Sequence, residues 1–202
     1  MAVMTADGVP SAEPTAIPRR AIQIVPLKGL PVVAVIVVGL VVSIAANWRW
    51  ALMFYHVAGG GLWTGIDLFV GFVIGPILGR LSIPARAEFS SKFMPMMVLI
   101  MPTLVLMTLA AGFQTAVNLG NLDPASVNHG WLVVSFIIVG ILATVALGVL
   151  EPANVAVLWE MNKPRPNGEV IARLMRRFVY AAGITGAMQV ATLVIMTRIT
   201  TQ

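Results

Sequence analysis

Five long apolar runs constrain the fold of this chain more than any other feature of its sequence. They cover residues 30–48, 51–79, 93–118, 131–150 and 178–197. Each run is long enough to cross a hydrocarbon core about 30 Å thick, which takes roughly 20 helical residues. The bilayer core holds no water to satisfy backbone N–H and C=O groups, so runs of this length cross it as helices. We therefore predict an all-α fold, a polytopic bundle of five transmembrane helices.

Composition supports this class and argues against others. Of the 202 residues, 58% are hydrophobic and 10% are charged, whereas a soluble globular domain has about 25% charged residues. There is no cysteine, so disulfides and thiolate metal sites are excluded. No phosphate loop, zinc signature, dinucleotide fingerprint or Ser-His-Asp order occurs. The motifs therefore do not indicate an enzyme.

The distribution of lysine and arginine predicts the orientation in the membrane. Eleven of the thirteen basic residues belong to the N-terminal segment, the loop 80–92 or the loop 163–177, and the other two are Arg49 and Arg198. Short cytoplasmic loops carry an excess of basic residues. We therefore expect the N-terminus in the cytoplasm and the C-terminus outside, in a bacterial inner (plasma) membrane. Nucleic-acid binding is not predicted, because it needs a basic patch with aromatic residues on a folded domain.

The N-terminal residues 1–25 are rich in Ala, Pro and Thr and have no apolar period. This composition is typical of a disordered tail, so we expect a disordered cytoplasmic tail there and a transmembrane bundle over residues 26–202. The Arg19-Arg20 pair, with Ser43-Ile44-Ala45 near the end of the first run, also fits a cleaved signal sequence, which would leave four spans. An uncleaved first span is favoured, because the tail is long and the run is long enough to cross the membrane.

The second apolar run contains two ionisable side chains, His56 and Asp67. Ionisable groups inside a membrane are costly and usually functional. Steps of three and four residues place both on one helical face. The same run is rich in glycine, which allows two helices to approach closely, so we expect this span at the centre of the bundle. The glycines predicted to mediate helix packing are Gly61, Gly65, Gly71, Gly75 and Gly79.

His56 is the first candidate ligand of a cofactor. A neutral imidazole in an apolar site keeps the lone pair that haem iron or a transition metal needs. His129, expected in the same outer layer, and Met53, three residues before His56, are tentative further metal ligands, since a thioether with an imidazole suits Cu(I). The candidate cofactors are therefore haem b or copper. A histidine hydrogen-bonded across helices, with no cofactor, is the alternative and stays open.

Asp67 is expected near the midplane of the bilayer. A charged carboxylate there costs at least about 2.5 kcal/mol on insertion scales, so the group is expected to be protonated or paired. One interpretation is a proton relay. The other is a hydrogen bond that packs helices, to Thr64 or to a polar group on the last span such as Gln189. The sequence leaves both open.

The segment from His56 to Arg80 carries a pattern of its own. It reads His56-Val-Ala-Gly-Gly-Gly-Leu-Trp63-Thr-Gly65, followed by Phe69, Val70, Pro76 and Arg80. A membrane histidine, then Trp-x-Gly, then an apolar turn ending in proline and a basic residue resembles the start of proteins in the copper-resistance D superfamily. The resemblance covers residues 51–115. It implies copper handling or, by distant similarity to HemJ-type protoporphyrinogen oxidases, haem bound through His56. An uncharacterised branch of the superfamily fits best, because no His or Lys stands near Arg80.

These observations support one leading hypothesis and two alternatives. The leading one is an inner-membrane protein that binds haem b or copper near the outer leaflet through His56 and serves redox or metal handling. The alternatives are a non-catalytic subunit or anchor of a larger complex, and a small proton-coupled transporter that uses Asp67. The expected partners are the lipid bilayer and either other membrane subunits or further copies of this chain.

Overall fold

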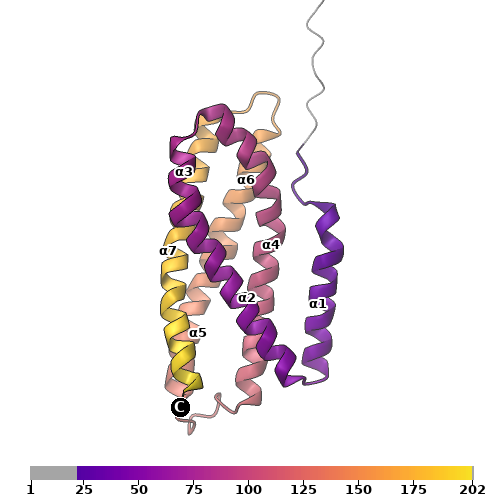
Figure 1. Ribbon diagram of the computed structural model, residues 1–202, viewed down its shortest axis with the longest axis vertical. Coiled ribbons are helices and arrows are strands. Elements are labelled where there is room, and N and C mark those ends of the chain that lie inside the picture. The colour runs from indigo at the N-terminus through magenta and orange to yellow at the C-terminus, as the bar shows by residue number, and fades with distance from the viewer. Residues whose placement is uncertain (1–21, 202) are drawn as a thin grey trace, which may run out of the picture.

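Residues 22–201, which the computed structural model describes, form helices joined by short connections, with no strand among them. The α-helices shown in Figure 1 are α1 (Leu30–Ala45), α2 (Arg49–Phe69), α3 (Gly75–Arg80), α4 (Ile83–Asn118), α5 (His129–Val145), α6 (Glu151–Met161) and α7 (Gly168–Thr200). A 3-10 turn, η1 (Leu27–Gly29), precedes α1, and two π-helical segments, η2 (Val70–Ile74) and η3 (Ala146–Leu150), join α2 to α3 and α5 to α6. The all-α prediction is confirmed for these residues.

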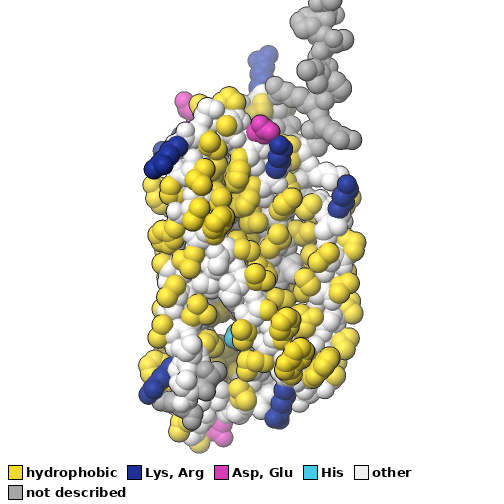
Figure 2. All heavy atoms as spheres, in the orientation of Figure 1, with side chains coloured by type: hydrophobic (Ala, Val, Ile, Leu, Met, Phe, Trp, Pro, Cys, Tyr) yellow, Lys and Arg dark blue, Asp and Glu magenta, His cyan; other side chains and the backbone are white. Residues whose placement is uncertain are grey.

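These elements combine into five helical stretches that are long and apolar enough to cross a membrane. They are Leu27–Ala45, Arg49–Arg80, Ile83–Asn118, His129–Met161 and Gly168–Ile199. Figure 2 shows hydrophobic side chains over the middle of one face, while Lys, Arg, Asp and Glu lie near its two ends. The prediction of five apolar helices of membrane-crossing length is thus confirmed.

Three helical stretches extend well beyond the apolar runs predicted as spans. The third span begins at Ile83 rather than at residue 93, the fifth begins at Gly168 rather than at 178, and the fourth continues to Met161 rather than ending at 150. Local capping accounts for one of these ends. At the start of α7, the side chain of Asn167 accepts hydrogen bonds from two backbone N–H groups, those of Glu169 and Val170.

Each π-helical segment ends shortly before a proline, Pro76 after η2 and Pro152 after η3. Proline removes one helical hydrogen bond, and the wider turn takes up the change in register. The N–H of Gly75 bonds to the carbonyl of Val70, five residues back. At Glu151 and Pro152 the helix continues as α6, so the helical stretch does not end at residue 150.

The most buried of the five spans is α4, not the second span. Of an 18-residue apolar stretch in each span, 39% of the residues are buried in α4, against 28% in the span made of α2, η2 and α3. The second span was expected at the centre of the bundle. In Figure 1, α2 crosses in front of α4 and leads to α7, and α1 packs at the side. Methionines explain the difference, since flexible thioethers fill irregular core space. The core methionines of α4 are Met94, Met97, Met101 and Met107.

Residues 22–25 fall in the expected disordered tail 1–25 but are held to the bundle. The backbone N–H of Ile22 donates to Asn162 Oδ1 at 2.8 Å, and its carbonyl accepts from Asn162 Nδ2 at 3.0 Å. Ile22 and Ile24 are also partly buried against the core. The predicted tail is therefore too long at its end, and its residues 1–21 lie outside the described part of the chain.

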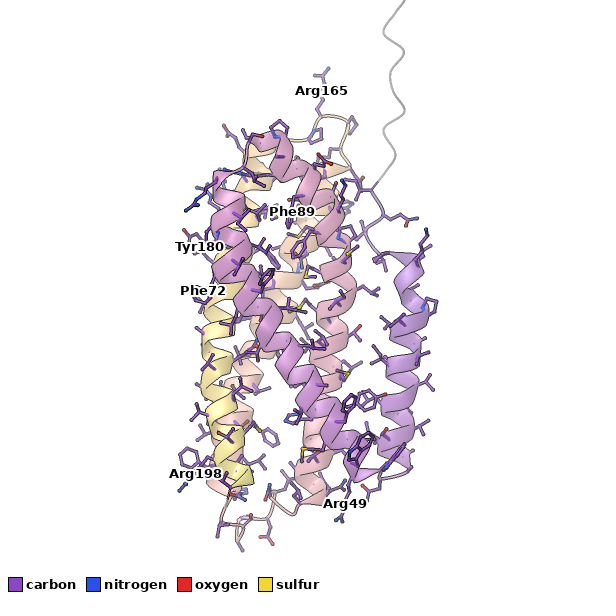
Figure 3. The ribbon with its side chains drawn as sticks, viewed as in Figure 1. Arg49, Phe72, Phe89, Arg165, Tyr180 and Arg198 are labelled. Atoms are coloured by element: carbon purple, nitrogen blue, oxygen red, sulfur yellow. The ribbon has the colours of Figure 1, made fainter. Side chains whose placement is uncertain are left out.

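The bundle has two chemically distinct ends. Arg165 lies at one end, and Arg49 and Arg198 lie at the other (Figure 3). We call the first the basic end. It holds the α3–α4 and α6–α7 connections, and most of the chain's lysines and arginines lie in or near these connections. We call the second the Arg49 end. Which end faces the cytoplasm stays a prediction.

Candidate functional site

A cavity of about 340 Å³ lies in the half of the bundle nearest the Arg49 end. Four helices surround it, namely α2, α4, α5 and α7, and most of its lining is apolar. The lining includes Met53, His56, Trp63, Thr108, Gly112, Phe113, Leu132, Ser135, Gln189, Thr192 and Met196. A concave, mostly apolar space with a few convergent polar groups is the usual form of a binding site for a small molecule or cofactor.

His56 is held in one orientation at the wall of this cavity. Its Nδ1 lies 2.9 Å from the backbone carbonyl of Thr108 on α4. A carbonyl only accepts hydrogen bonds, so Nδ1 carries the hydrogen and Nε2 of the neutral ring keeps its lone pair. Gly112 makes room for the ring, because a Cβ at this position would overlap His56 Nδ1 and Cε1. The arrangement presents an imidazole whose second nitrogen is free to bind a metal or accept a proton.

Several buried polar atoms of the lining make no hydrogen bond within the described chain. They are Thr108 Oγ1, Thr115 Oγ1, Ser135 Oγ, Gln189 Oε1 and Thr192 Oγ1. More than about 90% of buried polar groups in proteins are paired, and each one left unpaired costs about 1–3 kcal/mol. Their concentration around one cavity indicates that it takes up polar partners, either water or the polar edge of a ligand.

Asp67 lies deeper in the bundle and is only 2% exposed. Its Oδ2 accepts a hydrogen bond from Gln189 Nε2 at 2.8 Å and lies 3.1 Å from Thr185 Oγ1. The hydroxyl of Thr185 has a single hydrogen, and the Ala181 and Ala182 carbonyls lie equally close at 3.0 Å. Of the two packing partners named from the sequence, Gln189 is the one observed, while Thr64 donates to the carbonyl of Gly60.

Gln189 connects the Asp67 cluster to the cavity. Its amide nitrogen donates to Asp67, whereas its amide oxygen is unpaired, and the residue belongs to the cavity lining. The carboxyl group of Asp67 is therefore one side chain away from whatever occupies the cavity.

The candidate metal ligands are only partly brought together. Met53 and His56 line the same cavity, one turn apart on α2. His129 begins α5 and does not belong to the cavity lining, and its Nδ1 lies 3.3 Å from the carbonyl of Asn121. Within residues 22–201, no group of three or more His, Cys, Asp or Glu side chains is placed to hold a metal ion.

The predicted packing glycines divide into two groups. A Cβ at Gly71 would overlap the backbone of Gly183 on α7, and one at Gly75 would overlap Val179. At Gly61, Gly65 and Gly79 a Cβ would meet no atom within 4 Å. The close approach of two helices thus involves Gly71 and Gly75, and the other three glycines lie in open space within this chain.

Sequence reasoning did not identify the partners of these residues on other helices. Thr108 and Gly112 fix His56, and Thr185 faces Asp67. Gly186 allows α7 to approach Asp67, because a Cβ there would lie 2.9 Å from the backbone nitrogen of Leu68. One signal was available, since Gly183 and Gly186 form a pair of small residues around a polar threonine within the last apolar run.

The fold and this site define the class of the protein: a multi-pass helical membrane protein with a cavity between its apolar helices. Comparison of the chain with protein-family models, with curated proteins and with solved structures found no match in any of the three.

Proposed function

We propose that this protein binds haem b in the cavity at the Arg49 end, that His56 Nε2 would hold its iron, and that the protein serves redox chemistry in the membrane. The observation that carries the proposal is the hydrogen bond from His56 Nδ1 to the Thr108 carbonyl at 2.9 Å. This bond leaves Nε2 as the nitrogen with the lone pair. A haem bound there supplies a one-electron redox couple.

The residues around the cavity fit such a group. An apolar lining from four helices suits the macrocycle, and the unpaired hydroxyl groups of Thr115, Ser135 and Thr192 suit its polar edge. His56 would hold the iron, and the Thr108 carbonyl would fix the ring plane and increase the basicity of the imidazole. Gln189 would pass the protonation state of Asp67 to the cavity through its amide group.

Copper is the second ligand class that this cavity suits. Met53, His56 and Met196 all belong to its lining, and two thioethers with an imidazole match the preference of Cu(I) for soft ligands. A copper site would use Met53, whereas haem binding through His56 does not require it. The two cofactors are therefore distinguishable by substitution.

Titration of the purified chain with haemin and, separately, with Cu(I) tests these proposals. We expect one saturable Soret transition that is lost in His56→Ala and retained in His129→Ala, the matched control outside the cavity. Met53→Leu should leave haemin binding unchanged. If copper is the natural ligand, the same substitution should weaken Cu(I) binding. A folded protein that binds neither cofactor would favour a non-catalytic subunit or anchor.

A proton-coupled transporter is favoured by one separate observation, the contact of Gln189 with both Asp67 and the cavity. In this proposal Asp67 takes up and releases the coupled proton while a substrate occupies the cavity. Asp67→Asn keeps the hydrogen-bond acceptor but removes the titration. Loss of proton-driven uptake into vesicles with unchanged thermal stability would support this function over haem binding.

We also propose that the basic end faces the cytoplasm of a bacterial plasma membrane. The proposal follows from the excess of Lys and Arg at that end. It places the cavity at His56 in the outer half of the membrane, on the side from which extracytoplasmic copper would arrive.

A further inference from the structure

A second cavity, of about 480 Å³, lies near the basic end between α3, the start of α4 and α7. It is separate from the cavity at His56 and shares no lining residue with it. Figure 3 labels Tyr180, one of its lining residues, on the part of α7 beside α3. Tyr180 is 70% exposed, and tyrosine favours the level of the lipid headgroups.

One wall of this cavity is apolar and has few side chains. Gly71, Gly75 and Gly79 contribute only backbone, and Ile171, Met175 and Val179 belong to the lining on α7. A Cβ at Gly79 would meet no atom within 4 Å, so the space beside the end of α3 is open. A narrow apolar surface of this kind suits a hydrocarbon chain.

Two cationic side chains belong to the same lining, Arg86 from α4 and Arg176 from α7. Arg86 is fixed, because its Nε donates to the Leu81 carbonyl at 2.9 Å and its Nη2 donates to the Gly79 carbonyl at 2.8 Å. Arg176 is exposed and belongs to the part of the cavity lining that α7 contributes. None of the lining residues is Asp or Glu. The cavity therefore combines positive charge with an apolar wall.

An acidic residue close to Arg86 does not neutralise the cavity. Glu88 pairs with Lys92 at 2.8 Å, on the surface of α4. The guanidinium groups of Arg86 and Arg176 remain the charged groups of the lining, and arginine binds phosphate oxygens through charge-assisted hydrogen bonds.

We propose that this cavity binds one anionic phospholipid, with its phosphate between Arg86 and Arg176 and an acyl chain along the apolar lining beside Gly79. Basic pockets between transmembrane helices on the cytoplasmic side are suited to anionic headgroups, and the basic end is the predicted cytoplasmic end. Free phosphate would use only the arginines and leave the apolar wall exposed to water, so a lipid satisfies more of the lining.

Lipid binding to the full-length chain in mild detergent tests this inference. The probes are phosphatidylglycerol, phosphatidylcholine with the same acyl chains, and inorganic phosphate, followed by native mass spectrometry and by the midpoint of thermal unfolding. We expect one tightly retained phosphatidylglycerol, and a loss of affinity of about tenfold in Arg176→Gln, since one charge-assisted contact is removed. Arg177→Gln is the matched control, because Arg177 is exposed and lies outside the lining.

A second variant tests the acyl-chain half of the site. Gly79→Leu places a side chain in the free space beside α3, and Gly65→Leu places one in open space on α2. Only Gly79→Leu should weaken retention of phosphatidylglycerol. Equal retention of the two lipids, an equal loss in Arg176→Gln and Arg177→Gln, or equal stabilisation by inorganic phosphate would overturn the proposal.

Discussion

His56 and Gly112 illustrate how a single residue on one helix sets the chemistry of a residue on another. The imidazole lies against Gly112 and donates to the carbonyl of Thr108. Both partners belong to α4, four residues or about one turn apart. The orientation of His56 is therefore a property of the contact between α2 and α4.

Substitution of Gly112 tests this orientation. Gly112→Ala adds a Cβ that would overlap His56 Nδ1, so the ring must move and its hydrogen bond to Thr108 should break. We expect haemin affinity to fall by at least about tenfold, the equivalent of one lost hydrogen bond. Gly140→Ala on α5 is the control, since a Cβ there meets no atom within 4 Å. Equal haemin affinity in the two variants would show that Gly112 does not position the ring.

Asp67 and Gln189 should be energetically coupled. Their side chains are joined by a 2.8 Å hydrogen bond between buried groups on α2 and α7. Interhelical hydrogen bonds of this kind contribute about 0.6 kcal/mol on average and at most about 1.7 kcal/mol. A double-mutant cycle of Asp67→Leu and Gln189→Leu, followed by reversible unfolding in mixed micelles, should give a coupling free energy in this range. A coupling of zero would contradict the observed contact.

Candidate residues were predictable from sequence where they stand out from their surroundings. His56 and Asp67 are polar residues in an apolar run, and rarity alone marks them. Thr108 and Gly112 carry no such signal, because threonine and glycine are ordinary in membrane helices. Their roles depend on the register between α2 and α4, which the sequence of either helix does not determine.

At the scale of whole elements, the contact between the second and fifth spans depends on small residues. Gly71 faces Gly183 backbone to backbone, and Gly186 lies against Asp67 and Leu68. Such contacts replace side-chain packing by close backbone approach. They bring Thr185 and Gln189 within hydrogen-bonding distance of Asp67.

Two glycine substitutions, one in η2 at the contact and one in α2 away from it, test this contact. Gly71→Ala should destabilise the fold by about 1–3 kcal/mol, the usual cost of overpacking, because its Cβ would overlap the backbone of Gly183. Gly65→Ala should be neutral or stabilising by up to about 1 kcal/mol, since alanine favours the helix and the position is open. Thermal unfolding in detergent compares them. Equal stability of the two variants would argue against the contact.

Helix existence was predictable from hydropathy, whereas helix ends were not. The apolar runs locate the segment that fits the hydrocarbon core, but α4 and α7 begin at Ile83 and Gly168, well before their runs. Asn167 caps α7, and both helices continue beyond the apolar runs. The π-helical segments before Pro76 and Pro152 were also not predicted, because a proline signals a lost hydrogen bond without showing how the helix absorbs it.

At the scale of the whole molecule, charged side chains lie near the two ends of the bundle and apolar side chains cover the middle (Figure 2). The order of five apolar helices follows from the sequence, but their arrangement does not. The glycine-rich second span was expected at the centre, and the methionine-rich α4 is the more buried of the two. Burial in a membrane bundle follows packing, and lipid and protein interior are too similar in polarity for hydropathy to distinguish them.

The orientation in the membrane can be measured cleanly because the chain has no cysteine. Asp123→Cys places a thiol in the α4–α5 connection at the Arg49 end, and Arg165→Cys places one at the basic end; both positions are exposed. A membrane-impermeant thiol reagent added to intact cells should label Asp123→Cys. It should label Arg165→Cys only after the membrane is opened. The reverse pattern would contradict the predicted orientation and would place the cavity at His56 on the cytoplasmic side.

The central claim is that His56 holds a redox cofactor in the cavity between α2, α4, α5 and α7. The most direct measurement is the reduced-minus-oxidised optical spectrum of the protein purified from membranes in mild detergent. Haem bound through His56 predicts a Soret and α-band pair in the wild-type protein that is absent from a folded His56→Ala variant. Bands that persist in His56→Ala, or a folded wild-type protein without them, would contradict the claim.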